Sequence, residues 1–209
     1  YLGIALSLLM LVLCCAGLAF ADTTTAVSVL PSSQTVSPGQ AFTINVTVEP
    51  AEAIAGVQFD LSFDPSLVTV NSVTEGDLLN QGGANTYFSP GTIDNTAGTI
   101  TGVAGAITTP GATVSLSGTF ATISLTAGAT EGTSVLDLLN VVVRDINGSP
   151  VAITVNSGTV TVEECAPWDV NCDQEVNVLD LIRGGQHWGE TGTPGWIRED
   201  VNDDGVVSV

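Results

Sequence analysis

Residues 57–70 read VQFDLSFDPSLVTV, and this stretch decides the fold class. Apolar and polar side chains alternate from Val57 to Phe63, an Asp64-Pro65 pair follows, and the alternation resumes near Leu67. Alternation with period two is typical of a strand with one buried and one solvated face, and Asp and Pro favour tight turns. The stretch therefore predicts two strands joined by a turn.

The same pattern runs outward from this stretch through residues 24–162. Strands are expected at 26–30, 42–48, 57–63, 67–73, 86–89, 99–103, 118–126, 134–143, 151–155 and 158–162. Turn pairs such as Pro38-Gly39, Pro90-Gly91 and Asn147-Gly148 lie between them. Many short strands without a helical period predict an all-β, jelly-roll-like sandwich over residues 22–162.

The charge balance excludes several classes of function. The 209 residues carry 22 Asp and Glu against three Arg and no Lys, for a net charge of −19. Binding to nucleic acid or to an anionic membrane needs basic side chains, so neither is expected. Because His187 is the single histidine, neither a histidine-rich metal site nor several histidine acid–base residues are expected. The acids of the sandwich form no recognisable catalytic pair, so no enzyme is expected.

The first 21 residues have the features of a targeting segment. Residues 2–20 are nearly all apolar and lead into Ala19-Phe20-Ala21, a small-x-small cleavage pattern. This predicts a secretory signal peptide at 1–21 and a secreted or cell-surface protein. A retained membrane anchor is the alternative, because the stretch is almost long enough to span a bilayer.

The composition changes after Val162, where residues 163–168 are predicted to be a linker. Residues 169–180 then place oxygen-bearing side chains at positions 1, 3, 5, 9 and 12 of a twelve-residue loop, and a backbone carbonyl at position 7. Calcium takes six to eight oxygen ligands from such spacing. The predicted ligands are Asp169, Asn171, Asp173, the carbonyl of Glu175, Asn177 and Asp180.

The same frame restarts 31 residues later, which makes calcium the favoured cofactor over solvated acidic turns or helix starts. Asp200, Asn202, Asp204 and the carbonyl of Val206 take positions 1, 3, 5 and 7. Two departures qualify the pattern. Gln174 replaces the usual glycine at position 6 of the first loop, and Val209 is only position 10 of the second, so the domain at 169–209 is expected to be truncated.

Cys165 and Cys172 lie on the linker and at position 4 of the first loop. An oxidising compartment favours a disulfide that pins the linker to the loop. A redox or metal-binding thiol pair is the alternative, but it lacks both the C-x-x-C spacing and a histidine partner nearby.

The ordered set of sandwich motifs resembles a cohesin domain, the receptor module of cellulosome-type assemblies. The resemblance rests on residues 38–46 and 56–70, on the stretch 118–125 and on Asp145-Ile146-Asn147-Gly148. It implies that a partner's dockerin binds one sheet face, with residues 56–63 and 86–103 as the candidate segments. The duplicated loops resemble a dockerin, a small α domain with paired EF-hand-like loops that binds cohesins. In that family loop positions 10 and 11, here Val178 and Leu179, help to choose the partner.

The sequence thus predicts a secreted, non-catalytic assembly protein whose partners are dockerin- or cohesin-bearing proteins. Because a cohesin-like domain and a dockerin-like domain share one chain, head-to-tail self-association is a further expected mode of assembly. The protein is expected to associate with polysaccharide only indirectly. The alternatives are a carbohydrate-binding sandwich, for which only Tyr87-Phe88 offers an aromatic platform, and a generic surface-layer or Ig-like domain carrying a dockerin.

Overall fold

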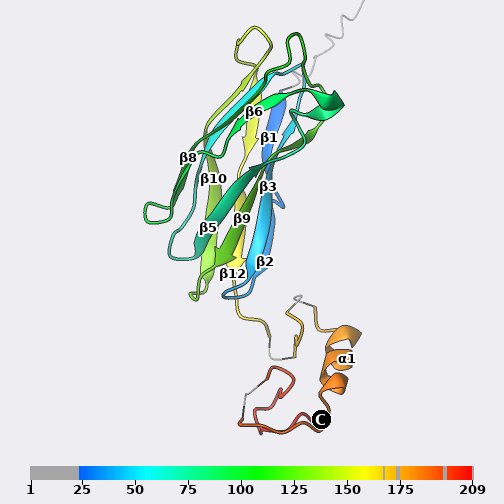
Figure 1. Cartoon of the computed structure of the whole chain (residues 1–209). Coiled ribbons are helices and arrows are strands. Elements are labelled where there is room, and N and C mark those ends of the chain that lie inside the picture. The colour runs from blue at the N-terminus through cyan, green and yellow to red at the C-terminus, as the bar shows by residue number, and fades with distance from the viewer. Residues whose placement is uncertain (1–23, 167, 173–174, 195–196, 209) are drawn as a thin grey trace, which may run out of the picture.

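The computed structural model describes residues 24–208 except 167, 173–174 and 195–196. The predicted signal peptide at 1–21 therefore lies outside the described residues, as do Asp173 and Gln174. Two β-sheets pack face to face, and an acidic tail with one described helix follows at the end of the sandwich where β2 and β12 lie (Figure 1). The strands are β1 Thr25–Leu30, β2 Ser33–Val36, β3 Ala41–Glu49, β4 Gly56–Ser62, β5 Val68–Glu75, β6 Thr86–Ser89, β7 Thr92–Asp94, β8 Thr99–Ile107, β9 Gly118–Ala127, β10 Gly132–Arg144, β11 Ile153–Asn156 and β12 Gly158–Val162. A 3₁₀ turn η1 spans Gln81–Gly83, and the helix α1 spans Val178–Gln186.

The first sheet has the order β11-β1-β3-β9-β5, and the second has the order β2-β12-β10-β4-β8-β6 with β7 also paired to β8. Most neighbours are antiparallel, while β1–β11 and β2–β12 are parallel. The all-β sandwich predicted from the sequence is confirmed. The strands β2 and β7 were not predicted, because SQTV and TID are too short and too polar to show alternation.

The core lies between the sheets and is built from the apolar positions of the alternating strands. Phe59, Phe120 and Phe88 meet there edge to face, with ring centroids 5.9 and 5.7 Å apart in the successive pairs. Gly105 on β8 lies against this aromatic cluster. Burial of this apolar surface is the main term that stabilises the sandwich.

The Asp64-Pro65 turn forms as the sequence predicts. The Asp64 carboxylate accepts hydrogen bonds from the backbone N–H of Ser66 at 2.9 Å and from its hydroxyl at 2.6 Å. These bonds, the hydroxyl bond first, lower the pKa of Asp64. The backbone N–H of Asp64 donates to the buried Ser134 hydroxyl of β10 at 2.9 Å, so the turn is also fixed to the facing strand.

Candidate functional site

The outer face of β10, β4, β8 and β6 is the first candidate site. The outward residues of β4 and β8 stand next to buried positions: Gln58 and Asp60 on β4, and Thr101, Ala104 and Ala106 on β8. On β6, Tyr87 and Ser89 lie on the side opposite Phe88, which packs on Phe120. Val135 and Leu139 of β10 extend the surface, with 56% and 42% of their area exposed. We call this surface the docking face. It combines small side chains with a few exposed apolar ones, and such a surface can approach a partner closely.

The structure brings together the two segments that the sequence singled out. Gln58 pairs with Ala104 across β4 and β8, and Tyr87 pairs with Ala106 across β6 and β8. The segments expected from the sequence do not include β10, although Leu139 pairs directly with Asp60 on this face. The interruption of the alternation at Leu139-Asn140 was the available sign, because a broken period marks a β-bulge.

The aromatic platform expected of a carbohydrate-binding sandwich is reduced to one ring. Tyr87 is 60% exposed on the docking face, but the neighbouring Phe88 points into the core and packs on Phe120. Alternation along β6 requires this, since adjacent residues of a strand point to opposite faces. The pair Tyr87-Phe88 therefore offers no joint stacking surface.

The tail is the second candidate site, and its two acidic loops share a backbone pattern. In each loop the N–H of position 4 donates to the carbonyl of position 1, at 3.4 Å from Cys172 to Asp169 and 3.2 Å from Asp203 to Asp200. Both position-4 residues have a positive φ, 59° and 53°, and both position-1 aspartates are only 2% exposed. The 31-residue sequence repeat is thus also a repeat of local structure.

The position-1 carboxylate of the second loop is held by backbone donors. Asp200 accepts hydrogen bonds from the N–H groups of Asp204 at 3.1 Å and Gly205 at 2.9 Å. Gly205 stands at position 6 with a φ of +85°, a conformation that glycine adopts without strain. The chain therefore wraps around one carboxylate, with the side chains of Asn202 and Asp204 on the same loop.

In the first loop the last two predicted ligands, Asn177 and Asp180, also cap the N-terminus of α1. Asn177 is the N-cap: its side chain accepts from the N–H of Leu179 at 2.8 Å, and Asp180 accepts from the N–H of Asn177 at 2.8 Å. Asp180 accepts a further bond from the N–H of Asn171 at 3.2 Å. The N–H of Asn177 is the main cause that lowers the pKa of Asp180. A capping box accounts for the contacts between Asn177 and Asp180 without a metal, whereas the bond from Asn171 links the start of the loop to its end.

The donor set suits a hard cation, although the described residues alone do not complete it. Among them, no three His, Cys, Asp or Glu side chains are grouped so that they could hold an ion. The N–H of Asn171 contacts the Asp180 carboxylate across the first loop, while Asp173 lies outside the described residues. Carboxylate, amide and carbonyl oxygens are the ligands that calcium prefers.

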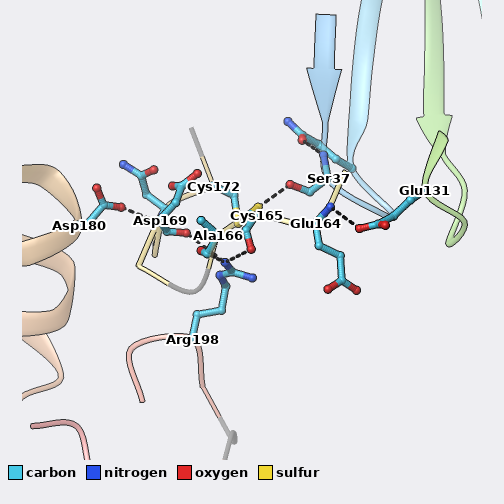
Figure 2. Close-up of a disulfide and its surroundings, with 11 residues drawn as sticks. Ser37, Glu131, Glu164, Cys165, Ala166, Asp169, Cys172, Asp180 and Arg198 are labelled. Carbon is cyan, nitrogen blue, oxygen red and sulfur yellow. Dashed lines mark hydrogen bonds between the residues drawn. A yellow bond between two sulfur atoms is a disulfide. The ribbon is translucent and has the colours of Figure 1, made fainter. Parts of the chain in front are cut away.

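The junction between the sandwich and the tail is held by a disulfide and an arginine (Figure 2). Cys165 and Cys172 are bonded, with their Cα atoms 5.4 Å apart, and Cys165 Sγ lies 2.6 Å from the Ser37 hydroxyl. The Arg198 guanidinium donates to the carbonyls of Ala166 and Asp169, both at 3.1 Å, and more distantly to that of Cys165. The segment before the second loop is thereby tied to the segment before the first.

The helix α1 presents an apolar, unpartnered surface. Val178 and Leu179, the predicted partner-binding pair, are 63% and 53% exposed. Beside them lies a groove of about 610 Å³, and among the residues that line it are Trp168, Val176, Leu181, Trp188 and Val207. The position-8 residues of the two loops, Val176 and Val207, both line this groove, while the backbone of Val207 bonds to Gly189 and Glu190.

The family model of the cohesin domain matches residues 26–162. The chain belongs to the cohesin family. The matched residues begin in β1 and end with β12, so they comprise the whole sandwich of this cohesin and none of its tail. No curated protein shows significant sequence similarity to the chain. Within the described residues, no helix has the length and apolar character needed to cross a membrane.

Solved structures share the fold of this cohesin at low sequence identity. A non-cellulosomal cohesin of the archaeon Archaeoglobus fulgidus is 17% identical with a TM-score of 0.54, covering 68% of this chain and 93% of that one. CaCohA2 of Clostridium acetobutylicum is 23% identical with a TM-score of 0.54, covering 66% and 90%. The cohesin of the OlpC–Doc435 complex of Clostridium thermocellum is 17% identical with a TM-score of 0.56, covering 68% and 96%.

Proposed function

We propose that this cohesin is a secreted, non-catalytic receptor module that binds a dockerin of a partner protein on its docking face. The observation that carries the proposal is the character of this face. It lies on antiparallel strands, its side chains are mostly small, and Val135, Leu139 and Tyr87 supply exposed apolar area. A helix can lie on such a surface and bury an interface of ordinary size, whereas one isolated tyrosine is a poor platform for sugar rings.

The solved relatives support this assignment. The Clostridium thermocellum cohesin was solved in a type I cohesin–dockerin complex, and CaCohA2 was solved in complex with a variant of CaDoc0917. We therefore place this chain in an extracellular or cell-surface assembly of the cellulosome type, in which any polysaccharide is handled by other components.

Binding of the full chain to immobilised Doc435 and CaDoc0917 in the presence of calcium tests the proposal. We expect saturable binding to at least one dockerin, and loss of binding when Leu139 is replaced by Asp, because a buried unpaired charge is costly. The matched control Leu116→Asp alters a leucine that is 71% exposed outside the docking face and is expected to bind like the wild type. Retention on cellulose or chitin that Tyr87→Ala abolishes, without dockerin binding, would instead favour a carbohydrate-binding module.

We further propose that the tail is a calcium-binding, dockerin-like module. The matched geometry of the two acidic loops and the oxygen-rich donor set support this. Asp169, Asn171, Asp173, Asn177 and Asp180, with the Glu175 carbonyl, would hold one ion, and Asp200, Asn202, Asp204 and the Val206 carbonyl would contribute to a second. Val178 and Leu179 would then face a partner's cohesin, either in a foreign protein or in another copy of this chain.

Calorimetric titration of the full chain with Ca²⁺ tests this second proposal. We expect heat of binding at or below millimolar Ca²⁺ and a weakening of at least tenfold in Asp169→Asn, since position 1 is buried at the centre of its loop. Asp203→Asn removes the same charge at position 4, outside the predicted ligands, and should bind nearly as the wild type does. Absence of heat in the wild type would contradict the proposal.

A further inference from the structure

An acidic residue stands at the centre of the docking face, where two strands are irregular. Asp60 lies in the middle of β4, a strand flanked by β10 and β8. The register between β4 and β10 shifts between Leu139 and Val142, and the register between β4 and β8 shifts between Phe59 and Leu61. In both cases the neighbouring strand carries one extra residue, so each neighbour has a β-bulge next to Asp60.

Both bulges contain a residue with a left-handed backbone. Asn140 of β10 has a φ of 49°, and Gly102 of β8 has a φ of 72°. Glycine adopts this conformation freely, and asparagine tolerates it better than most residues do. Each bulge also disrupts the regular ladder of backbone hydrogen bonds, so the local geometry needs another source of support.

The Asp60 carboxylate supplies that support to both sides at once. One oxygen, Oδ1, accepts a hydrogen bond from the backbone N–H of Gly102 at 2.7 Å. The other, Oδ2, accepts a hydrogen bond from the Asn140 side-chain amide, also at 2.7 Å. Hydrogen bonds to an ionised acceptor are roughly twice as strong as neutral ones. Aspartate is otherwise disfavoured inside strands, so this position is accounted for by its contacts and not by strand propensity.

We propose that Asp60 is the positioning residue of the docking face. By holding the two bulges it sets the direction of Leu139 on β10 and of Thr101 on β8, which flank it on the outer surface. The partner's affinity then depends on Asp60 through the shape of the face and not through its charge. This inference rests on the proposed function for its meaning, because the face is taken to be the dockerin site.

A charge-neutral exchange separates positioning from direct contact. In Asp60→Ala both hydrogen bonds are lost. In the double variant Asp60→Asn/Asn140→Asp, the new amide at position 60 accepts from Gly102 through its oxygen and donates through its nitrogen to the new carboxylate at position 140. The bridge is rebuilt while the charge moves from β4 to β10. Ser72→Ala, at an exposed position of β5 in the other sheet, is the matched control outside the docking face.

The binding test uses Doc435 and CaDoc0917 with the full chain. We expect Asp60→Ala to weaken the affinity at least tenfold, the double exchange to restore it to within about threefold of the wild type, and Ser72→Ala to change little. Wild-type affinity in Asp60→Ala would overturn the inference. If the double exchange binds no more tightly than Asp60→Ala, the inference is also overturned, because the partner would then contact the carboxylate at position 60 directly.

A measurement without any partner keeps the inference distinct from the proposed function. Amide hydrogen exchange followed by NMR should show the Gly102 N–H exchanging at least tenfold faster in Asp60→Ala, with protection regained in the double exchange. The core amide of Ile123 on β9 serves as an internal control for intact folding. If the wild type binds neither dockerin, the proposed function fails while this exchange pattern still decides the role of Asp60. Unchanged protection at Gly102 in Asp60→Ala would refute that role.

Discussion

Gly105 shows how a single missing side chain shapes the core of this cohesin. A Cβ built at this position would lie 2.8 Å from Phe120 Cε2 and 3.1 Å from Leu79 Cδ1. Both neighbours are buried. Because Phe120 is also in edge contact with Phe59 and Phe88, its ring cannot move freely away from an added methyl group. We expect Gly105→Ala to lower the free energy of unfolding by about 1–3 kcal/mol through overpacking.

Thermal or denaturant unfolding of the full chain measures this effect. Ala106→Ser, on the exposed side of the same strand, is the control and should stay within about 0.5 kcal/mol of the wild type. Equal stability of the two variants would mean that the aromatic cluster can relax around an added methyl group.

Asp145 makes the stability of the sandwich depend on pH. The backbone N–H of Ser149 is the main cause that lowers the pKa of this carboxyl, and the N–H of Asn147 donates to the same oxygen. A pKa that is lower in the folded state stabilises the fold at pH values above the unfolded pKa, and this stability is lost as the pH falls through the folded pKa. We expect Asp145→Asn to lower the melting temperature at pH 7, with the difference shrinking to nothing toward pH 2.

Melting curves recorded between pH 7 and pH 2 test this titration. Ser149→Ala keeps the backbone donor and should keep the pH dependence of the wild type. A difference between wild type and Asp145→Asn that is the same at every pH would show that the carboxylate charge has no part in the turn.

At the scale of elements, the strands followed from the sequence where burial imposed alternation. The limits of β6 and β12 agree with the expected ranges, and most other strands differ by one or two residues. The end of β8 was missed because Ala104-Gly105-Ala106 gives weak strand propensity, although its neighbours pair with β4 and β6. The bulges at Gly102 and Asn140 depend on a cross-strand carboxylate, a contact that no local pattern encodes.

The two candidate sites were predicted to different extents, because local patterns in the sequence reveal only residues that are close together along the chain. Regular spacing along one segment reveals the tail loops, since their ligands come from consecutive turns of the chain. The docking face draws on strands far apart in the sequence. The broken alternation at Leu139-Asn140 marks a bulge in β10, but the position of β10 beside β4 followed only from the sheet order.

The last turn of α1 contains two glycines, Gly184 and Gly185, that lower the stability of the helix. Gly184 and Gly185 have open space around the position of a Cβ, and neither has a positive φ. Alanine is favoured over glycine in a helix by about 0.5–1 kcal/mol. We expect Gly185→Ala to slow amide exchange in α1 two- to fivefold. Gly189→Ala, at a φ of +80°, should act in the opposite direction, and slower exchange in both variants would contradict the backbone explanation.

For the whole molecule, the placement of tryptophan separates the behaviour of the two parts. All three tryptophans lie in the tail, so their fluorescence reports on the tail alone. We expect a chelator to loosen the tail and change this fluorescence, because calcium binding stabilises the ordered state by mass action. The main unfolding transition of the sandwich, followed by far-UV circular dichroism, should stay within a few degrees. A large chelator effect on that transition would reveal a metal site within the sandwich.

The short connection after β12 limits the reach of the tail. The N–H of Glu163 donates to the Val36 carbonyl, and the N–H of Glu164 donates to the Glu131 carboxylate at the end of the sandwich (Figure 2). The connection to the tail therefore begins at Cys165. The four residues 165–168 span at most about 14 Å. Along β10, Gly132 pairs with Val162 and Leu139 pairs with Asp60, so Asp60 lies seven residues, or about 23 Å, further along the sandwich. The connection is therefore too short to bring the start of the tail, Asp169, level with Asp60 on the same molecule. A tail that starts this close to the end of its own sandwich favours contact with the docking face of another molecule, so the length of any chains formed by self-association would depend on concentration.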